Sequence, residues 1–148
     1  MNVLIIGSGA REHTFAWKIF NSNHDIKIFV TNPNAGISKI SISVDVDIYD
    51  FVSIKKSIIK HSIDIVLIGP EIPLINGIAD FINNASDLKH VNVIGPSQKG
   101  AMLEGSKEFA KNFMAKYKIP TASYKSFNKS TFDQALSFIN KNTPPYVL

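Results

Sequence analysis

The stretch Asn2-Val3-Leu4-Ile5-Ile6-Gly7-Ser8-Gly9-Ala10-Arg11-Glu12-His13 decides the fold. A short apolar run rich in β-branched residues ends at two glycines, and the apolar residues that follow recur at helical spacing: Phe15, Ala16, Ile19 and Phe20. This pattern predicts a strand, a glycine turn and a helix. Glycines in such a turn let backbone N–H groups approach an anion, and the helix directs its positive end toward the same place.

Similar units follow along the chain. Strand-like apolar runs over residues 26–30, 40–44, 63–68 and 91–94 are separated by segments of helical spacing over 49–61 and 74–82. Continuous apolar strands that alternate with helices are typical of a parallel sheet covered on both faces. The sequence therefore predicts an α/β fold with a Rossmann-like, doubly wound parallel sheet over residues 1–103. Ligand loops of such sheets gather at the carboxyl ends of the strands.

Residues 104–148 have a different pattern. Helical spacing over 106–117 is followed by a short strand-like run over 122–127 and by a second helical segment over 131–140. Tyr146-Val147-Leu148 has the character of the first residues of an apolar strand. So short a segment is marginal for an independent core. We expect a linker and the incomplete start of a second domain.

Composition excludes several classes of protein. The chain has 148 residues, 45% of them hydrophobic, and no cysteine, which rules out disulfides, a thiol nucleophile and zinc–thiolate sites. The net charge of +4 comes from lysines spread along the chain, without the aromatic-interleaved basic runs typical of nucleic-acid binding. The apolar run near Met1 is too short for a signal peptide or a membrane span. We expect a cytoplasmic protein that binds neither nucleic acid nor membrane.

Arg11 and Glu71 are the most informative charged residues. Arg11 is the only arginine beside 15 lysines, and it directly follows the glycine turn. Glu71 follows Gly69-Pro70 after the strongest strand, and in a doubly wound sheet the two loops face each other across the point where the strand order reverses. An arginine there suits a phosphate, and a carboxylate suits ribose hydroxyls or an amine. The alternatives are a plain tight turn and a helix-capping role for Glu71.

The remaining motifs either allow more than one interpretation or exclude a particular ligand. Glu12 stands where the dinucleotide fingerprint has its third glycine, and no clear acidic residue follows the second strand, so a compact sugar phosphate fits better than NAD. The run Asn32-Pro33-Asn34-Ala35-Gly36 fits either a loop that touches the ligand or an ordinary turn. None of the four histidines has a partner at metal-ligand spacing. Lys107 at the start of a helix reads as a surface residue on its own.

The motifs taken together are more specific than any one of them. They are Gly7 to His13, Asn34-Ala35-Gly36, Gly69-Pro70-Glu71-Ile72-Pro73-Leu74 with Gly77, Gly95-Pro96-Ser97, Leu103-Glu104-Gly105-Ser106-Lys107 and Lys118-Ile119-Pro120-Thr121-Ala122. In this order and spacing the chain resembles the N-terminal part of the phosphoribosylamine–glycine ligases, also called glycinamide ribonucleotide synthetases, of the ATP-grasp superfamily. Ala10 and Thr14 depart slightly from the usual family residues.

The resemblance implies an activity and a set of site residues. The family joins 5-phosphoribosylamine to glycine with cleavage of ATP, giving glycinamide ribonucleotide in de novo purine biosynthesis. By position, the residues implied to bind phosphoribosylamine are Gly7, Gly9, Arg11, Glu12, Asn34, Gly36 and Glu71. Lys107 would reach the phosphates of ATP. The complete enzyme would use ATP with Mg²⁺ or Mn²⁺, whose ligands, like the catalytic residues, are expected outside this chain.

The resemblance also sets expectations about the whole molecule. We expect residues 1–103 to be the substrate-binding domain and residues 104–148 the beginning of the ATP-grasp domain. Small molecules would be the only partners of a monomer. A chain of this length would be inactive by itself and is expected to be an incomplete form of the enzyme. The alternatives are a non-catalytic module that binds a sugar phosphate or a nucleotide, and the remnant of a decaying gene.

Overall fold

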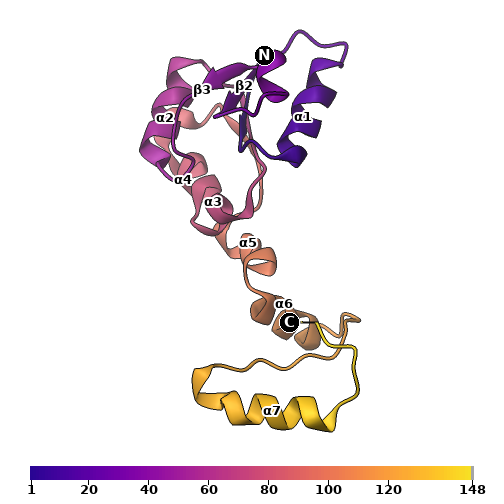
Figure 1. Cartoon of the computed structure of the whole chain (residues 1–148). Coiled ribbons are helices and arrows are strands. Elements are labelled where there is room, and N and C mark those ends of the chain that lie inside the picture. Colours follow the sequence, from indigo (N-terminus) through magenta and orange to yellow (C-terminus); the bar gives the residue numbers. More distant parts are fainter. Residues whose placement is uncertain (148) are drawn as a thin grey trace. The chain divides into compact units, whose positions relative to one another are not determined.

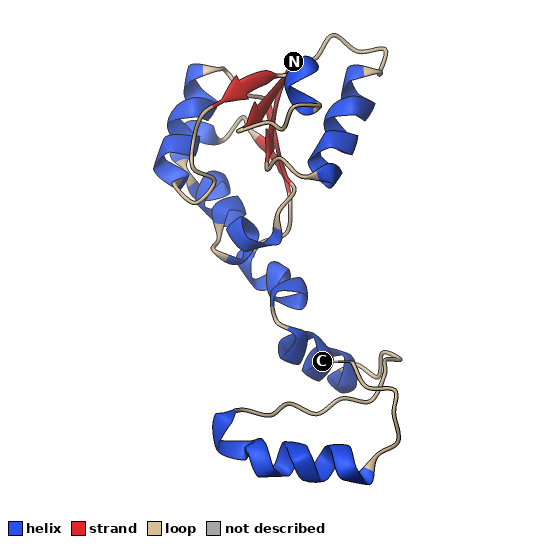
Figure 2. Ribbon diagram, in the orientation of Figure 1, coloured by secondary structure: helices blue, strands red, loops and turns tan. Residues whose placement is uncertain are grey.

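A computed structural model describes residues 1–147 of the chain (Figure 1). Contacts between residues divide the chain into two compact units, Met1–Ser106 and Lys107–Leu148. The first unit holds the sheet, and the second consists of helices and loops (Figure 2).

The first unit is built on a five-stranded parallel sheet in the order β3-β2-β1-β4-β5. Its strands are β1 (Asn2–Ile6), β2 (Lys27–Thr31), β3 (Ile42–Val44), β4 (Ile65–Ile68) and β5 (Asn92–Ile94). In the register of the central strands, Leu4 of β1 lies between Phe29 of β2 and Val66 of β4. The chain crosses from β3 over β2 and β1 to β4, so the strand order reverses beside β1. The predicted Rossmann-like α/β fold is confirmed.

Alternate residues of the strands feed two apolar clusters on opposite faces of the sheet. Leu4 and Ile6 of β1 belong to the larger cluster, whereas Val3 and Ile5 belong to the smaller one. Helices α2 (Phe51–Lys60) and α4 (Ile78–Asn84) supply the larger cluster, and α1 (Ala10–Phe20) packs over the smaller one (Figure 2). Helices on both faces explain why the strands read as continuous apolar runs.

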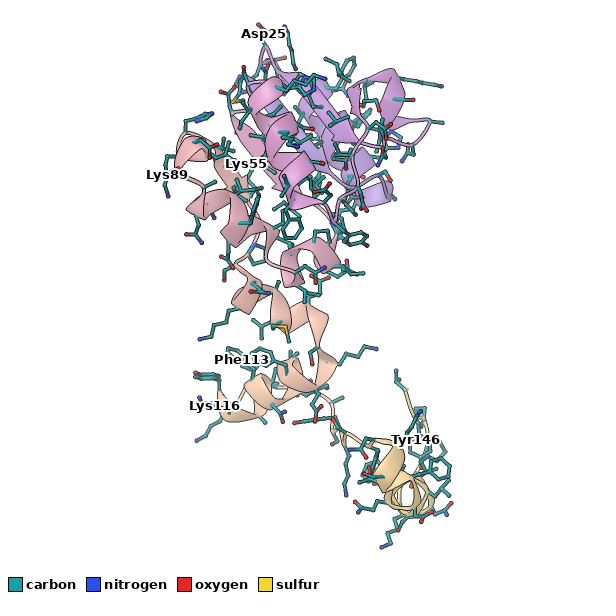
Figure 3. All side chains as sticks on the ribbon, turned by 90° about the vertical axis from the view of Figure 1, so that its left-hand side faces the viewer. Asp25, Lys55, Lys89, Phe113, Lys116 and Tyr146 are labelled. Carbon is teal, nitrogen blue, oxygen red and sulfur yellow. The ribbon has the colours of Figure 1, made fainter. Side chains whose placement is uncertain are left out.

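The segment after β4 differs from the single helix predicted over residues 74–82. It contains two short helices, α3 (Glu71–Ile75) and α4, and they are separated at Gly77, which has φ +93°. A left-handed backbone ends a helix and suits glycine. Three further elements were not predicted: helix α5 (Gln98–Gly105) and the 3-10 turns η1 (Ile37–Lys39) and η2 (Ser86–Leu88). The Lys55 ammonium group, labelled in Figure 3, pairs with Asp87 of η2 at 2.7 Å.

Asp50 caps helix α2. Its carboxylate accepts hydrogen bonds from the Ser53 hydroxyl at 2.6 Å and from the Ser53 N–H at 3.1 Å. The bond from the Ser53 hydroxyl, followed by the bond from its backbone N–H, lowers the pKa of Asp50 below its ordinary value. A depressed folded-state pKa stabilises the fold above the unfolded-state pKa, and this stabilisation is lost as the pH falls through the folded-state pKa.

We therefore expect Asp50→Ala to lower the free energy of unfolding at neutral pH, and the deficit to shrink as the pH falls below 3.8, the ordinary pKa of an aspartate, and the wild-type carboxylate becomes protonated. Urea titrations at neutral pH and at a pH well below the ordinary pKa of an aspartate measure this difference. Asp50→Asn is the matched control because it keeps a capping oxygen but cannot titrate in this range. An alanine deficit of equal size at both pH values would contradict the electrostatic part of the argument.

The second unit contains α6 (Lys107–Lys116), the 3-10 turn η3 (Lys129–Thr131) and α7 (Phe132–Lys141). The strand predicted over 122–127 is wrong, because the described residues offer this segment no neighbouring strand. It contacts α6 instead: the Lys111 ammonium group donates to the Ala122 carbonyl and to the hydroxyl of the preceding residue, Thr121. Tyr146 and Val147 form no strand either, and Leu148 lies outside the described residues. Neither α6 nor α7 has a buried residue.

None of the helices formed by residues 1–147 has the length and apolar character needed to span a bilayer.

Candidate functional site

The glycine turn follows β1 at the point where the strand order reverses. Gly7 has φ +108°, a conformation that a side chain would strain. Its N–H donates to the hydroxyl of Thr31 at 2.8 Å, and Thr31 is buried at the carboxyl end of β2. This bond ties the start of the turn to the neighbouring strand. Helix α1 then begins at Ala10 with Gly9 as its N-cap.

Glu12 is buried beneath this turn, with 4% of its surface exposed. One carboxylate oxygen, Oε2, accepts a hydrogen bond from the Gly9 N–H at 2.6 Å. A Cβ atom built on Gly7 would lie 3.0 Å from Glu12 Cγ, one on Gly9 would lie 2.8 Å from Oε2, and one on Gly69 would lie 2.5 Å from Cδ. Three glycines from two strand-end loops therefore make the space that the Glu12 side chain fills.

The second oxygen of Glu12, Oε1, has no hydrogen-bond partner among the described residues although it is buried. Its nearest charged neighbour is the Arg11 guanidinium, whose Nε lies 3.5 Å away. The same guanidinium reaches Glu71 at the start of α3, with 3.7 Å between Nη2 and Oε2. Arg11 and Glu71 do face each other, as the topology predicts. One guanidinium thus lies between two carboxylates, one buried and one partly exposed.

The predicted rim loop after β2 is tied to the glycine turn. Asn34 donates from Nδ2 to the Ser8 carbonyl at 2.8 Å, and its Oδ1 accepts from the N–H groups of Gly36 and Ile37 at 2.9 and 3.0 Å. A Cβ atom on Gly36 would overlap the imidazole ring of His13. The observed contacts of Asn34 and Gly36 fix the geometry of two loops against each other.

A hollow of about 620 Å³ lies at the carboxyl ends of β1, β2 and β3. Its lining residues are Gly7, Ser8, Gly9, Glu12, Thr31, Asn32, Asp45, Val46, Asp47, Ile48 and Pro70. Sequence reasoning placed Gly7, Gly9 and Glu12 in the site and missed Thr31, Asp45 and Asp47. The available signal was positional, because these residues end or follow β2 and β3 at the edge where ligand loops gather.

Lys107 opens α6 in the second unit, so the structure does not relate it to the site around Arg11. Across residues 1–147, no three histidine or acidic side chains are grouped so that they could hold a metal ion.

The fold and this site define a Rossmann-like α/β domain with a glycine turn and a facing carboxylate at the switch point, a place where such domains bind small molecules. The model of the phosphoribosylglycinamide synthetase N domain matches residues 1–104, and that of the ATP-grasp (A) domain of the same enzymes matches residues 105–148. The chain belongs to the phosphoribosylglycinamide synthetase family.

Individual relatives agree with this assignment. The chain is 38% identical to the phosphoribosylamine–glycine ligase of Caldanaerobacter subterraneus and 40% identical to that of Mesorhizobium japonicum, and both matches cover 100% of it. They cover 34% and 33% of those relatives, so the chain spans about a third of their length. The crystal structure of the Thermotoga maritima phosphoribosylamine–glycine ligase matches 98% of the chain and 32% of that protein, with a TM-score of 0.65 and 25% identity.

Proposed function

We propose that this chain forms the N-terminal, substrate-binding part of an ATP-dependent ligase that joins 5-phosphoribosylamine to glycine in purine biosynthesis. Its family and the names of its relatives support this activity. The observation that carries the binding role is the Arg11 guanidinium held between Glu12 and Glu71 at the switch point. No other arginine is available in the chain for bidentate binding of a phosphate.

The contacts suggest how the work is divided among these residues. The N–H groups of Gly7 and Gly9 already have acceptors, on Thr31 and Glu12, so we assign them to shaping the turn. The phosphate would bind to the Arg11 side chain beside the first N–H groups of α1, which have no partner within the helix. Glu71 would then exchange part of its pairing with Arg11 for the amine or a hydroxyl of the substrate.

Residues 104–148 are proposed to serve the ATP-dependent step. We assign residues 104–148 to the beginning of the ATP-grasp domain, with Lys107 directed to nucleotide phosphates. The exposed apolar residues of α7, which include Phe132, Leu136 and Ile139, support a place for this unit inside a larger domain. ATP would supply the activation of glycine as an acyl phosphate. The chain spans about a third of the length of its relatives, and we place the Mg²⁺ ligands among residues that it does not include.

Ribose 5-phosphate tests the binding role. At a concentration about 100 times its Kd, such a ligand stabilises the folded state by about 2.7 kcal/mol, which raises the melting temperature of a domain of this size by several degrees. We expect Arg11→Ala to abolish this shift, and Arg11→Lys to reduce it strongly because an ammonium group cannot make the bidentate contact. Differential scanning fluorimetry over a ligand titration measures both effects.

Lys18→Ala is the matched control for the loss of one positive charge, since Lys18 lies in the last turn of the same helix. An unchanged shift in both Arg11 variants would exclude Arg11 as the phosphate-binding group. Stabilisation by NAD or AMP but not by ribose 5-phosphate would instead favour a nucleotide-binding module without this activity. A chain that responds to none of these ligands would fit a non-functional remnant.

A further inference from the structure

The hollow beside the glycine turn has an uneven charge. Three of its lining residues are acidic, Glu12, Asp45 and Asp47, and none is a lysine or an arginine. Arg11 is not among the lining residues, although its guanidinium lies next to Glu12. A phosphate inside the hollow would therefore face carboxylates without a compensating cation, which is unfavourable where solvent screening is reduced. The hollow suits groups that donate hydrogen bonds.

Glu12 gives an independent reason to expect a donor from a ligand. Its Oε1 is buried and accepts no hydrogen bond from the described residues; Arg11 Nε lies 3.5 Å away, as an ion-pair partner only. A buried polar atom without a partner is unfavourable, and native proteins rarely leave one unexplained. The hydrogen bond from the Gly9 N–H to the other oxygen, Oε2, holds the carboxylate in this position. A hydroxyl that entered the hollow would supply the hydrogen bond that Arg11 does not make to this oxygen.

The two aspartates lie on a segment whose position is fixed. Asn32, which has φ +44°, donates from Nδ2 to the Val46 carbonyl at 2.7 Å and so holds residues 45–47 against the end of β2. The Asp47 Oδ1 accepts from the Tyr49 N–H at 2.9 Å. Asp45 makes no hydrogen bond or ion pair with the described residues and is exposed, so its carboxylate is available to a ligand in the hollow.

We propose that this hollow binds hydroxyl groups of the sugar on the carboxylates of Asp45 and Glu12, while the phosphate stays outside the hollow at Arg11. This inference rests on the proposed function and adds an orientation to it. It makes Asp45 a specificity residue that distinguishes a sugar phosphate from phosphate alone. Asp47 shapes the segment that presents Asp45.

Isothermal titration of the 148-residue chain with ribose 5-phosphate and with inorganic phosphate tests the orientation. We expect Asp45→Ala to weaken the binding of ribose 5-phosphate about ten-fold, the effect of losing a hydrogen bond to a charged group. The variant should bind inorganic phosphate as well as the wild type does, or slightly better, because a negative charge near the anion is removed. Asp45 has no contact that folding requires, so the variant should melt like the wild type.

Asp25→Ala is the matched control, with the same change in charge. Asp25, labelled in Figure 3, precedes β2 at the amino end of the strand, whereas the hollow lies at the carboxyl ends of the strands. It should bind both ligands as the wild type does. If Asp45→Ala and the wild type bind ribose 5-phosphate with equal affinity, the orientation is overturned and the proposed function stays in place. The same holds if Asp45→Ala weakens the binding of ribose 5-phosphate and of inorganic phosphate equally. Failure of the wild type to bind ribose 5-phosphate would overturn both proposals.

Discussion

Gly69→Ala is expected to lower the free energy of unfolding by roughly 3 kcal/mol, the upper end of the range for overfilling a packed site. The new Cβ would lie 2.5 Å from Cδ and 2.6 Å from Cγ of Glu12, so either the side chain or the loop must move. The Gly69 N–H is also bonded to the Ile6 carbonyl at 3.1 Å, which restrains the loop. Urea denaturation followed by circular dichroism measures the loss.

The same substitution should disturb binding because Glu12 is in contact with Arg11. Glu12 Oε1 lies 3.5 Å from Arg11 Nε, so a displaced carboxylate changes the position of the guanidinium. We expect ribose 5-phosphate to raise the melting temperature of Gly69→Ala less than that of the wild type. Its binding should be weaker even at temperatures where the variant is folded.

A double-mutant cycle with Glu12→Ala isolates the contact. With the Glu12 side chain removed, Gly69→Ala should become much less harmful, because the atoms that the new methyl group meets are gone. Gly100→Ala is the control: its Cβ would lie no nearer than 3.3 Å to another atom, and the residue is inside α5, where alanine is the better helix former. Equal destabilisation of Gly69→Ala with and without Glu12 would show that the contact is not the cause.

The sheet could be predicted from the sequence because its signals are local. The central strands β1, β2 and β4 are largely apolar and buried, each is followed by a glycine or a polar residue, and helices on both faces of the sheet explain the apolar runs. The break at Gly77 could not be located, because Leu74, Ile78 and Ile82 keep one helical spacing across it and all three are buried. The apolar pattern reports which side chains face the core, and the two short helices place them on the same side.

The strand predicted over residues 122–127 shows that a local pattern cannot establish whether a strand has a partner. A strand forms only where another strand offers backbone partners, and the described part of the second unit contains none. Alternation along a segment indicates that it can pair, and the presence of a partner depends on the rest of the domain.

The candidate site was partly predictable for a similar reason. The positions of Arg11 and Glu71 follow from the topology, because both come directly after strands that are neighbours in a doubly wound sheet. The burial of Glu12 could not be predicted, because it depends on Gly69, 57 positions away along the chain, whose missing side chain makes the space. At Glu12 the sequence showed only that a glycine of the dinucleotide fingerprint was absent. The structure shows its carboxylate bonded to Gly9, one of the glycines of that turn.

Thr31→Val is expected to lower the free energy of unfolding by about 1–3 kcal/mol, the penalty of leaving one buried hydrogen-bonding group without its partner. Thr31 has 1% of its surface exposed, and its hydroxyl accepts the Gly7 N–H at 2.8 Å. Valine has nearly the same shape, so packing should be kept while the acceptor is lost. The freed N–H belongs to the glycine that starts the turn, and the variant should therefore also bind ribose 5-phosphate more weakly.

Thr31→Ser separates the hydrogen bond from the methyl group, because serine keeps the acceptor and loses only the methyl contact. Under the argument above, serine should retain ribose 5-phosphate binding and valine should lose much of it, although valine is the closer match in volume. Amide hydrogen exchange at Gly7 provides a direct measurement, since its N–H should exchange faster in Thr31→Val than in Thr31→Ser. Slow exchange in both variants would mean that Gly7 does not depend on Thr31, and that its glycines, Glu12 and Asn34 are sufficient to hold the turn.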